Sequence, residues 1–175
     1  MKNLPNALSA ARLVLAPVLF VFLWRQYWGW ALWVIAFAAL TDALDGLVAR
    51  RFHAATRTGE VLDPIADKIL LGGAFVAMAL NGSIEVWLAL LVIGRDVLIL
   101  TMAGGALARS SDRRFPPSIW GKASTVFQVL FILALVANLA AALPGAVLSV
   151  LKWTMAALTA WSGIDYARRA AYNRI

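Results

Sequence analysis

The chain consists of long apolar stretches that are interrupted by short polar or turn-forming segments. A helix that crosses the ~30 Å hydrocarbon core of a bilayer needs ~20 mainly apolar residues, because each residue adds ~1.5 Å. The stretches are rich in Ala and Leu and lack period-2 alternation, which favours helices over strands. The pattern predicts six helical spans: residues 7–24, 30–50, 60–81, 84–108, 119–141 and 146–168.

Composition supports a membrane protein. Of the 175 residues, 62% are apolar and 14% are charged, whereas a soluble domain carries ~25% charged residues. The chain has no cysteine, which excludes a disulfide scaffold and any thiolate metal site. The net charge of +7 is interpreted as loops that face an anionic membrane surface, with no nucleic acid as partner. We predict an all-α polytopic membrane protein that forms one domain over residues 1–175.

The basic residues gather on one side of the predicted membrane. Eleven of the sixteen Lys and Arg residues lie at the two chain ends or after the second and fourth spans, and Arg25 alone lies in the opposite loops. By the positive-inside rule, both termini are expected in the cytoplasm, which agrees with an even number of spans. A cleaved signal peptide is disfavoured, because Trp24-Arg25-Gln26 is not a small-residue cleavage site.

Ionisable residues also lie within the predicted spans, where each costs at least ~2.5 kcal/mol to insert. A position at the membrane interface accounts for Lys152 and Asp165, but not for four aspartates in the second and third spans. Asp42 and Asp45 share one face of a helix, and the other pair shares a face at i, i+4. The short connection makes these spans antiparallel neighbours, so the carboxylates meet at one end. The four are Asp42, Asp45, Asp63 and Asp67.

Four carboxylates cannot all stay ionised together without cations. Hard oxygen ligands in this number suit Mg²⁺ or Mn²⁺ better than basic side chains. The small residues Gly46, Ala49 and Gly59 leave room for a phosphate ligand to approach.

The whole run resembles the complete signature of the CDP-alcohol phosphotransferase family. It reads Asp42-x2-Asp45-Gly46-x2-Ala49-Arg50-x8-Gly59-x3-Asp63-x3-Asp67. Eight fixed positions would match by chance on the order of once in 10⁹ to 10¹⁰ starts. Other segments resemble the family, or its branch that makes phosphatidylglycerophosphate and cardiolipin: Leu4-Pro5-Asn6 with Arg12 and Pro17, residues 62–68, Gly94-Arg95-Asp96 and residues 118–128.

The resemblance implies a six-helix bundle, usually a homodimer, with two divalent cations (Mg²⁺ or Mn²⁺) in a site that faces the cytoplasm, as in a bacterial-type inner membrane. It implies that an acceptor hydroxyl displaces CMP from CDP-diacylglycerol. By motif position, the metal ligands would be Asp42, Asp45, Asp63 and Asp67, with Asp67 also the general base. The residues implied to contact the CDP-lipid are Gly46, Ala49, Arg50, Gly59 and Asn6, with Arg50 as a diphosphate clamp.

Three cations are candidates for holding an acceptor phosphate: Arg12, Arg95 and Lys122. A helix-end anchor is an open alternative for Lys122, as is a buried ion pair with Asp96 for Arg95. Relatives that use glycerol 3-phosphate tend to carry Arg-Glu in the fourth span and another arginine about two turns later. Here no cation follows Arg95 until Arg109, which favours phosphatidylglycerol as the acceptor, giving cardiolipin, over glycerol 3-phosphate.

Two functions from other classes also use aspartates in membranes. A prenyltransferase holds metal diphosphate with two acidic motifs, but these lie far apart in a longer bundle, whereas here both pairs fall within 26 residues. A cation transporter explains intramembrane carboxylates, but it does not need Gly46, Ala49 and Arg50 at fixed intervals. The phosphotransferase is therefore the preferred hypothesis.

Overall fold

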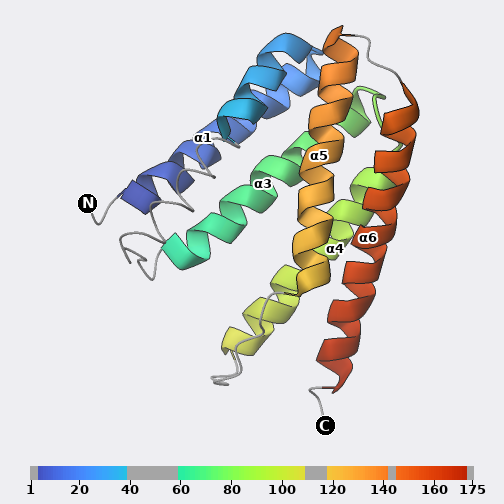
Figure 1. Ribbon diagram of the computed structural model, residues 1–175. Helices are drawn as coiled ribbons and strands as arrows, with labels where there is room; N and C mark the ends of the chain where they lie inside the picture. Colours follow the sequence, from blue (N-terminus) through green and yellow to red (C-terminus); the bar gives the residue numbers. More distant parts are fainter. Residues whose placement is uncertain (1–3, 39–58, 109–117, 142–144, 173–175) are drawn as a thin grey trace. The chain divides into compact units, whose positions relative to one another are not determined.

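The computed structural model describes residues 4–38, 59–108, 118–141 and 145–172, and every regular element in these ranges is an α-helix. The helices are α1 (Leu4–Trp24), α3 (Gly59–Leu80), α4 (Val86–Ala108), α5 (Ile119–Ala141) and α6 (Gly145–Tyr172) (Figure 1). A further apolar helix, Trp28–Ala38, follows α1. The predicted all-α fold is thus confirmed over the described residues.

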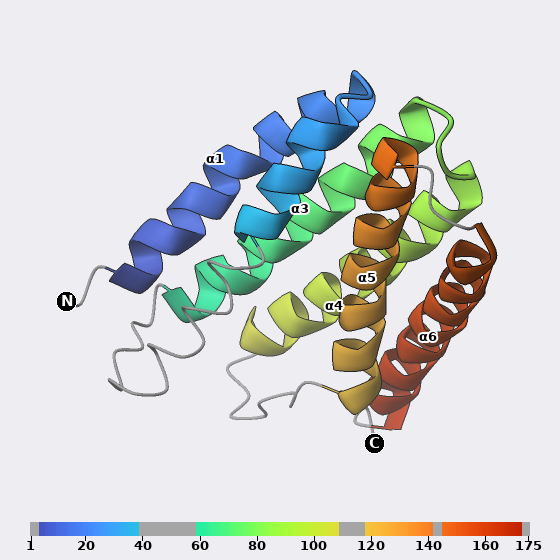
Figure 2. The same ribbon diagram turned by 45° about the horizontal axis from the view of Figure 1, so that its top comes forward.

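The chain divides into two compact units, one of residues 1–84 with 136–143 and one of residues 85–135 with 144–175. In the first unit, α1 and α3 pack side by side (Figure 2). Their C-terminal ends lie together, because the side-chain amide of Asn81 donates a 2.7 Å hydrogen bond to the Leu23 carbonyl. The two helices therefore run parallel, which requires the chain between them to return.

The ends of α1 and α3 are closed in the same way. The backbone takes a positive φ at Gln26 (61°) and at Gly82 (79°). In each case the following amide donates a hydrogen bond to the carbonyl five residues back, at 2.8 Å and 2.9 Å respectively. This arrangement satisfies carbonyl groups that the end of a helix otherwise leaves without partners.

Large and small apolar residues together fill the buried sides of the first unit. Leu19 and Leu23 of α1 and Phe75 and Met78 of α3 are almost fully buried, with Ala77 between them. The helix Trp28–Ala38 buries Ala31, Ile35 and Ala38. Its exposed residues are large and aromatic: Trp30, Trp33 and Phe37. Large apolar side chains that stay exposed in this way are typical of helices that face lipid.

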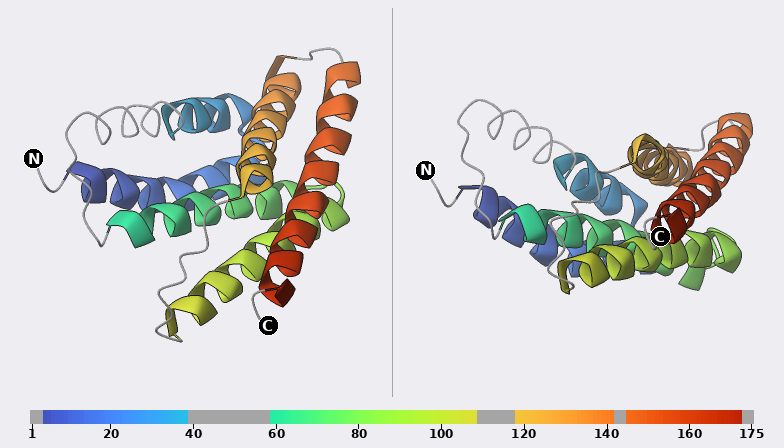
Figure 3. Two further views of the ribbon diagram at one scale, coloured as in Figure 1. Left: turned by 60° about the horizontal axis from the view of Figure 1, so that its bottom comes forward. Right: turned by 90° about the horizontal axis from the view of Figure 1, so that it is seen from below.

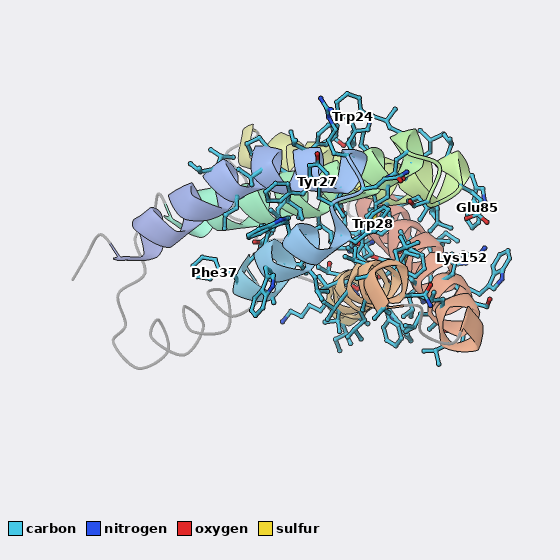
Figure 4. All side chains as sticks on the ribbon, turned by 90° about the horizontal axis from the view of Figure 1, so that it is seen from above. Trp24, Tyr27, Trp28, Phe37, Glu85 and Lys152 are labelled. Atoms are coloured by element: carbon cyan, nitrogen blue, oxygen red, sulfur yellow. The ribbon has the colours of Figure 1, made fainter. Side chains whose placement is uncertain are left out.

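In the second unit, α4 and α6 run parallel in a constant register. Glu85 is the residue directly before α4, and its Oε1 lies 2.8 Å from Nζ of Lys152 in α6 (Figure 4). Arg95 bonds to Ser162 ten residues further along each helix. Both contacts join residues 67 apart, so the two helices keep the same register over about 15 Å.

α5 runs antiparallel to α6 (Figure 3). Ser118, directly before α5, bonds to Asp165 near the end of α6, and Ser124 bonds to Thr159 one layer further in. The three helices of the second unit thus alternate in direction, as consecutive membrane crossings would.

Five of the six predicted spans agree with the observed helices to within a few residues, and residues 119–141 agree at both ends. The predicted span 30–50 matches the helix Trp28–Ala38 at its start, and residues 39–50 lie outside the described part of the chain. The largest difference is α6, which continues to Tyr172 instead of ending at residue 168. Asp165 and Arg169 form an i, i+4 ion pair of 3.1 Å that supports this last part of the helix. Over the described residues, two helices are long and apolar enough to cross a membrane, Ile119–Ala141 and Val147–Arg169. The six-span topology stays a prediction.

Candidate functional site

Part of the predicted donor site lies outside the described residues, namely Asp42, Asp45, Gly46, Ala49 and Arg50. Gly59 is the first residue of α3, and Asp63 and Asp67 lie one turn apart in that helix. The side chain of Asp63 also lies outside the described part of the chain. Within the described part, no three metal-ligating side chains gather in one place.

Asp67 lies where the packed side of α3 gives way to its exposed side. The preceding residue, Ala66, is 1% exposed, whereas the Asp67 side chain is exposed. Packing of Ala66 fixes the backbone, and the carboxylate of Asp67 is accessible to a ligand. A carboxylate with a second aspartate position one turn before it is a donor set that suits a hard divalent cation.

The second unit contains a buried polar cluster, which consists of Arg95, Asp96, Ser118, Gly121, Ser162, Asp165 and Tyr166. Arg95 lies at its centre and is 7% exposed. Its Nη1 lies 2.6 Å from Asp96 Oδ1, and its Nε and Nη2 donate to Ser162 Oγ at 3.2 Å and 3.1 Å. Its Nη2 also donates to the Gly121 carbonyl at 3.0 Å. The desolvation cost of the guanidinium is thus offset by an ion pair and three further hydrogen bonds.

The same cluster holds the start of α5 against α6. The Ser118 hydroxyl donates to Asp165 Oδ2 at 2.5 Å, and the Ser118 amide N–H donates to Tyr166 Oη at 3.1 Å. An amide before the first turn of a helix has no partner within the helix, and Tyr166 supplies one. The carboxylate of Asp165 lies near the positive end of the α5 dipole, which is favourable.

A second polar layer lies deeper between α5 and α6. Ser124 Oγ and Thr159 Oγ1 are 2.9 Å apart, and the amide nitrogen of Gln128 donates to both. All three side chains are at most 1% exposed. The amide oxygen of Gln128 has no hydrogen-bond partner in the described part of the chain. This layer is a helix–helix contact made of neutral groups.

The three predicted acceptor cations have different positions. Arg12 lies in α1, as does Asn6, and both side chains lie outside the described part. Arg95 is buried and engaged by its own chain. Lys122 lies in the first turn of α5 with an exposed side chain. Of the described pair, Lys122 is therefore the cation that a ligand can reach.

The Arg95–Asp96 ion pair that the sequence left as an alternative is present, but the α6 side of the polar cluster was not predicted. Asp165 was interpreted as an interfacial residue, and Ser162 and Tyr166 were not singled out. A usable signal was present, because Thr159, Ser162 and Tyr166 recur at i, i+3 and i+7 in an otherwise apolar helix. That spacing puts polar groups on one face, where a membrane helix meets other helices.

Comparison with known proteins extends the resemblance seen in the aspartate motif. Residues 2–161 match the family described as CDP-alcohol phosphatidyltransferase. A probable phosphatidylglycerophosphate synthase of Mycobacterium tuberculosis is 33% identical over 96% of this chain and 81% of its own length. A CDP-diacylglycerol–glycerol-3-phosphate 3-phosphatidyltransferase of Pseudomonas fluorescens is 33% identical over 96% and 90%. A CMP-forming cardiolipin synthase of Homo sapiens is 30% identical over 95% of this chain and 62% of its own length.

The family match covers the aspartate motif, α4, α5 and most of α6. It thus includes the exposed aspartate of α3 and the α4 and α5 side of the polar cluster, whereas Ser162, Asp165 and Tyr166 lie directly beyond it. With a family match over most of its length and relatives of 33% identity, the chain belongs to the CDP-alcohol phosphatidyltransferase family and is a transferase.

Proposed function

We propose that the protein transfers a phosphatidyl group from CDP-diacylglycerol to the primary hydroxyl of a glycerol-type acceptor and releases CMP. The observation that carries this proposal is the complete aspartate motif of residues 42–67 inside a family match that spans residues 2–161. Relatives named for the glycerol 3-phosphate reaction and for cardiolipin synthesis support an acceptor of the glycerol type.

Phosphatidylglycerol is the acceptor that we favour, with cardiolipin as the product. Arg95 is the sole basic residue of α4, and its guanidinium is bonded to Asp96, Ser162 and Gly121. α4 therefore offers no open cation to cradle the phosphate dianion of glycerol 3-phosphate. A lipid acceptor needs less of a cradle, because its acyl chains stay in the bilayer and only its headgroup must be oriented.

In the proposed reaction, Asp67 accepts the proton of the acceptor hydroxyl while the hydroxyl oxygen bonds to the phosphorus of the phosphatidyl group. The bond from that phosphorus to the CMP oxygen breaks, and CMP leaves with the electron pair. The four aspartates would hold two divalent cations, which would neutralise the negative charge of the diphosphate. Arg50 clamps the diphosphate, with Gly46, Ala49, Gly59 and Asn6 lining the donor, and Arg12 and Lys122 hold the acceptor phosphate.

We further propose a homodimer in a bacterial-type inner membrane, with six spans, both termini in the cytoplasm and the active site on that side. Parallel pairing of α1 with α3, and of α4 with α6, supports this topology, because alternate crossings of a membrane run in the same direction. Exposure of large apolar side chains on these helices, such as Val18, Leu90 and Val150, supports contact with lipid.

The test is CMP release by the purified protein in mixed micelles that contain CDP-diacylglycerol. Phosphatidylglycerol should give the fastest release, glycerol 3-phosphate the second fastest, and inositol phosphate or serine only background. Faster release with glycerol 3-phosphate would reverse the acceptor assignment and leave the chemistry at Asp67 intact. Absence of CMP release with all four acceptors would favour the rival classes, since neither a prenyltransferase nor a cation transporter forms CMP.

A further inference from the structure

The first turn of α5 is fixed from two other helices directly beside Lys122. The backbone N–H of Ser118 is bonded to Tyr166 of α6, and the carbonyl of Gly121 is bonded to Arg95 of α4. The amide of Lys122 donates to the Ser118 carbonyl at 3.1 Å, which closes this turn. The backbone of Lys122 is therefore held by the same contacts.

Gly121 lies in close contact with Arg95 and Tyr166, with no room for a side chain. A Cβ atom at Gly121 would lie 3.0 Å from Arg95 Nη2, 3.1 Å from Tyr166 Oη and 3.2 Å from Tyr166 Cε2. A side chain at this position would press against Arg95 and Tyr166, so glycine allows the first turn of α5 to approach both residues this closely. The hydrogen bonds of the turn to Arg95 and Tyr166 therefore hold a helix end that would otherwise be free to fray.

The charge at this position has no structural use in the described part of the chain. Lys122 is exposed, and no described side chain pairs with its ammonium group. A cation in the first turn also lies at the positive end of the helix dipole, which is unfavourable. An anion bound at the ammonium group would remove this cost.

Arg95 shows the opposite behaviour, because it is buried and its nitrogens bond to Asp96, Ser162 and Gly121. To bind an acceptor directly, it would have to give up one of these bonds. Building on the proposed function, we infer that Arg95, Ser162 and Tyr166 are positioning residues, which hold the first turn of α5 so that Lys122 meets the acceptor phosphate. These three residues are called the α5 anchor below.

The first experiment compares kinetic constants of the full-length Tyr166→Phe and Ser162→Ala variants with those of the unmodified protein. The KM for phosphatidylglycerol should rise about tenfold, because displacing a binding group by a fraction of an ångström has effects of this order. The KM for CDP-diacylglycerol should stay within about twofold, since the donor contacts lie in the first unit. An unchanged acceptor KM in both variants would overturn the inference.

Ser124→Ala is the matched control. It removes hydrogen bonds to Thr159 and Gln128 from the same pair of helices, one layer deeper, without touching the first turn of α5. Its acceptor KM should equal that of the unmodified protein. A rise as large as that of Tyr166→Phe would show that general loosening of α5 and α6 is the cause, and the anchor would then have no specific role.

A double variant tests whether the anchor acts through the lysine. Lys122→Gln alone should raise the acceptor KM, and adding Tyr166→Phe should raise it no further. Independent, multiplying effects would contradict positioning through Lys122, as would a Lys122→Gln variant with an unchanged acceptor KM.

Hydrogen exchange separates failure of the anchor from failure of the proposed function. The amides of residues 118–122 should exchange faster in Tyr166→Phe than in Ser124→Ala, whether or not any acceptor releases CMP. Equal exchange rates in the two variants would remove the anchor itself. Faster exchange without acceptor-dependent CMP release would leave the anchor standing and overturn only the proposed reaction.

Discussion

The exposed aspartate region of α3 and the buried polar cluster of α4 to α6 use charged residues in opposite ways. Asp67 is exposed next to the buried Ala66. Arg95 and Asp96 are 7% and 8% exposed and bond to each other. A buried charge must be satisfied by its own chain, whereas an exposed carboxylate can exchange its partners for a ligand. Charge is thus accessible at Asp67, where the proposed chemistry takes place, and buried at Arg95 and Asp96, where it joins helices.

The largest expected effect is on the predicted metal ligands. Asp42→Asn and Asp63→Asn should each lower CMP release by at least about 10²–10³-fold, because each removes a charged ligand needed to stabilise the transferring phosphoryl group. An excess of EDTA should abolish activity, and Mg²⁺ or Mn²⁺ should restore it. Glu85→Gln, which neutralises an acid outside the motif, is the control and should keep full activity. Full turnover in excess EDTA would contradict metal dependence.

Asp67→Asn should separate turnover from binding. As the proposed general base, Asp67 contributes about 10²–10⁴-fold to the rate, so kcat should fall by that factor. Binding of CDP-diacylglycerol and Mn²⁺ should be retained better than in Asp42→Asn, which can be measured by titration calorimetry in micelles. If both variants lost binding equally, Asp67 would be a metal ligand without a separate role as base.

The free energy of unfolding should depend more on the buried polar cluster than on the exposed aspartate region, which is the reverse of the order expected for activity. Arg95→Ala should lower the free energy of unfolding by about 3–5 kcal/mol, because it leaves the buried Asp96 carboxylate without its ion-pair partner. Asp67→Asn should change it by less than about 0.5 kcal/mol, as an exposed site. Unfolding in mixed micelles measures both values. A larger loss for Asp67→Asn than for Arg95→Ala would break the comparison between the two regions.

The smallest effect is expected at the exposed pair of Lys152 and Glu85. Removing it with Lys152→Gln should cost less than about 1 kcal/mol, since exposed ion pairs contribute little. The hydrogen bond from Lys152 holds the pKa of Glu85 below its ordinary value of 4.5.

A lowered carboxyl pKa makes the contribution of the Glu85 pair fully present above pH 4.5 and lost as the pH falls through the lowered value. The difference in unfolding free energy between the unmodified protein and Lys152→Gln should therefore shrink below pH 4.5. A difference that grows in acid would contradict this assignment. The small size of the effect would sharpen the contrast with the buried pair at Arg95.

Much of the fold could be predicted from the sequence. The apolar runs and their Gly, Asn and Pro boundaries predict both observed ends of α5. They also predict the ends of α1, α3 and α4 to within a few residues. The last turn of α6 was missed, because its polar residues resemble a helix end in a hydropathy pattern. It continues because Asp165 and Arg169 pair along the helix, and because Tyr166 and Asp165 bond to Ser118.

The sequence by itself determined the family and the proposed chemistry, because the aspartate motif is local. Its residue types and gaps all fall between Asp42 and Asp67, and helix periodicity alone relates them. Only the tertiary structure decided that Arg95 is buried and satisfied, and that Lys122 is accessible. The bonds of Arg95 reach 26 residues to Gly121 and 67 residues to Ser162. Contacts over such separations depend on the register in which helices pack, and side-chain packing between helices, which no single helix encodes, sets that register.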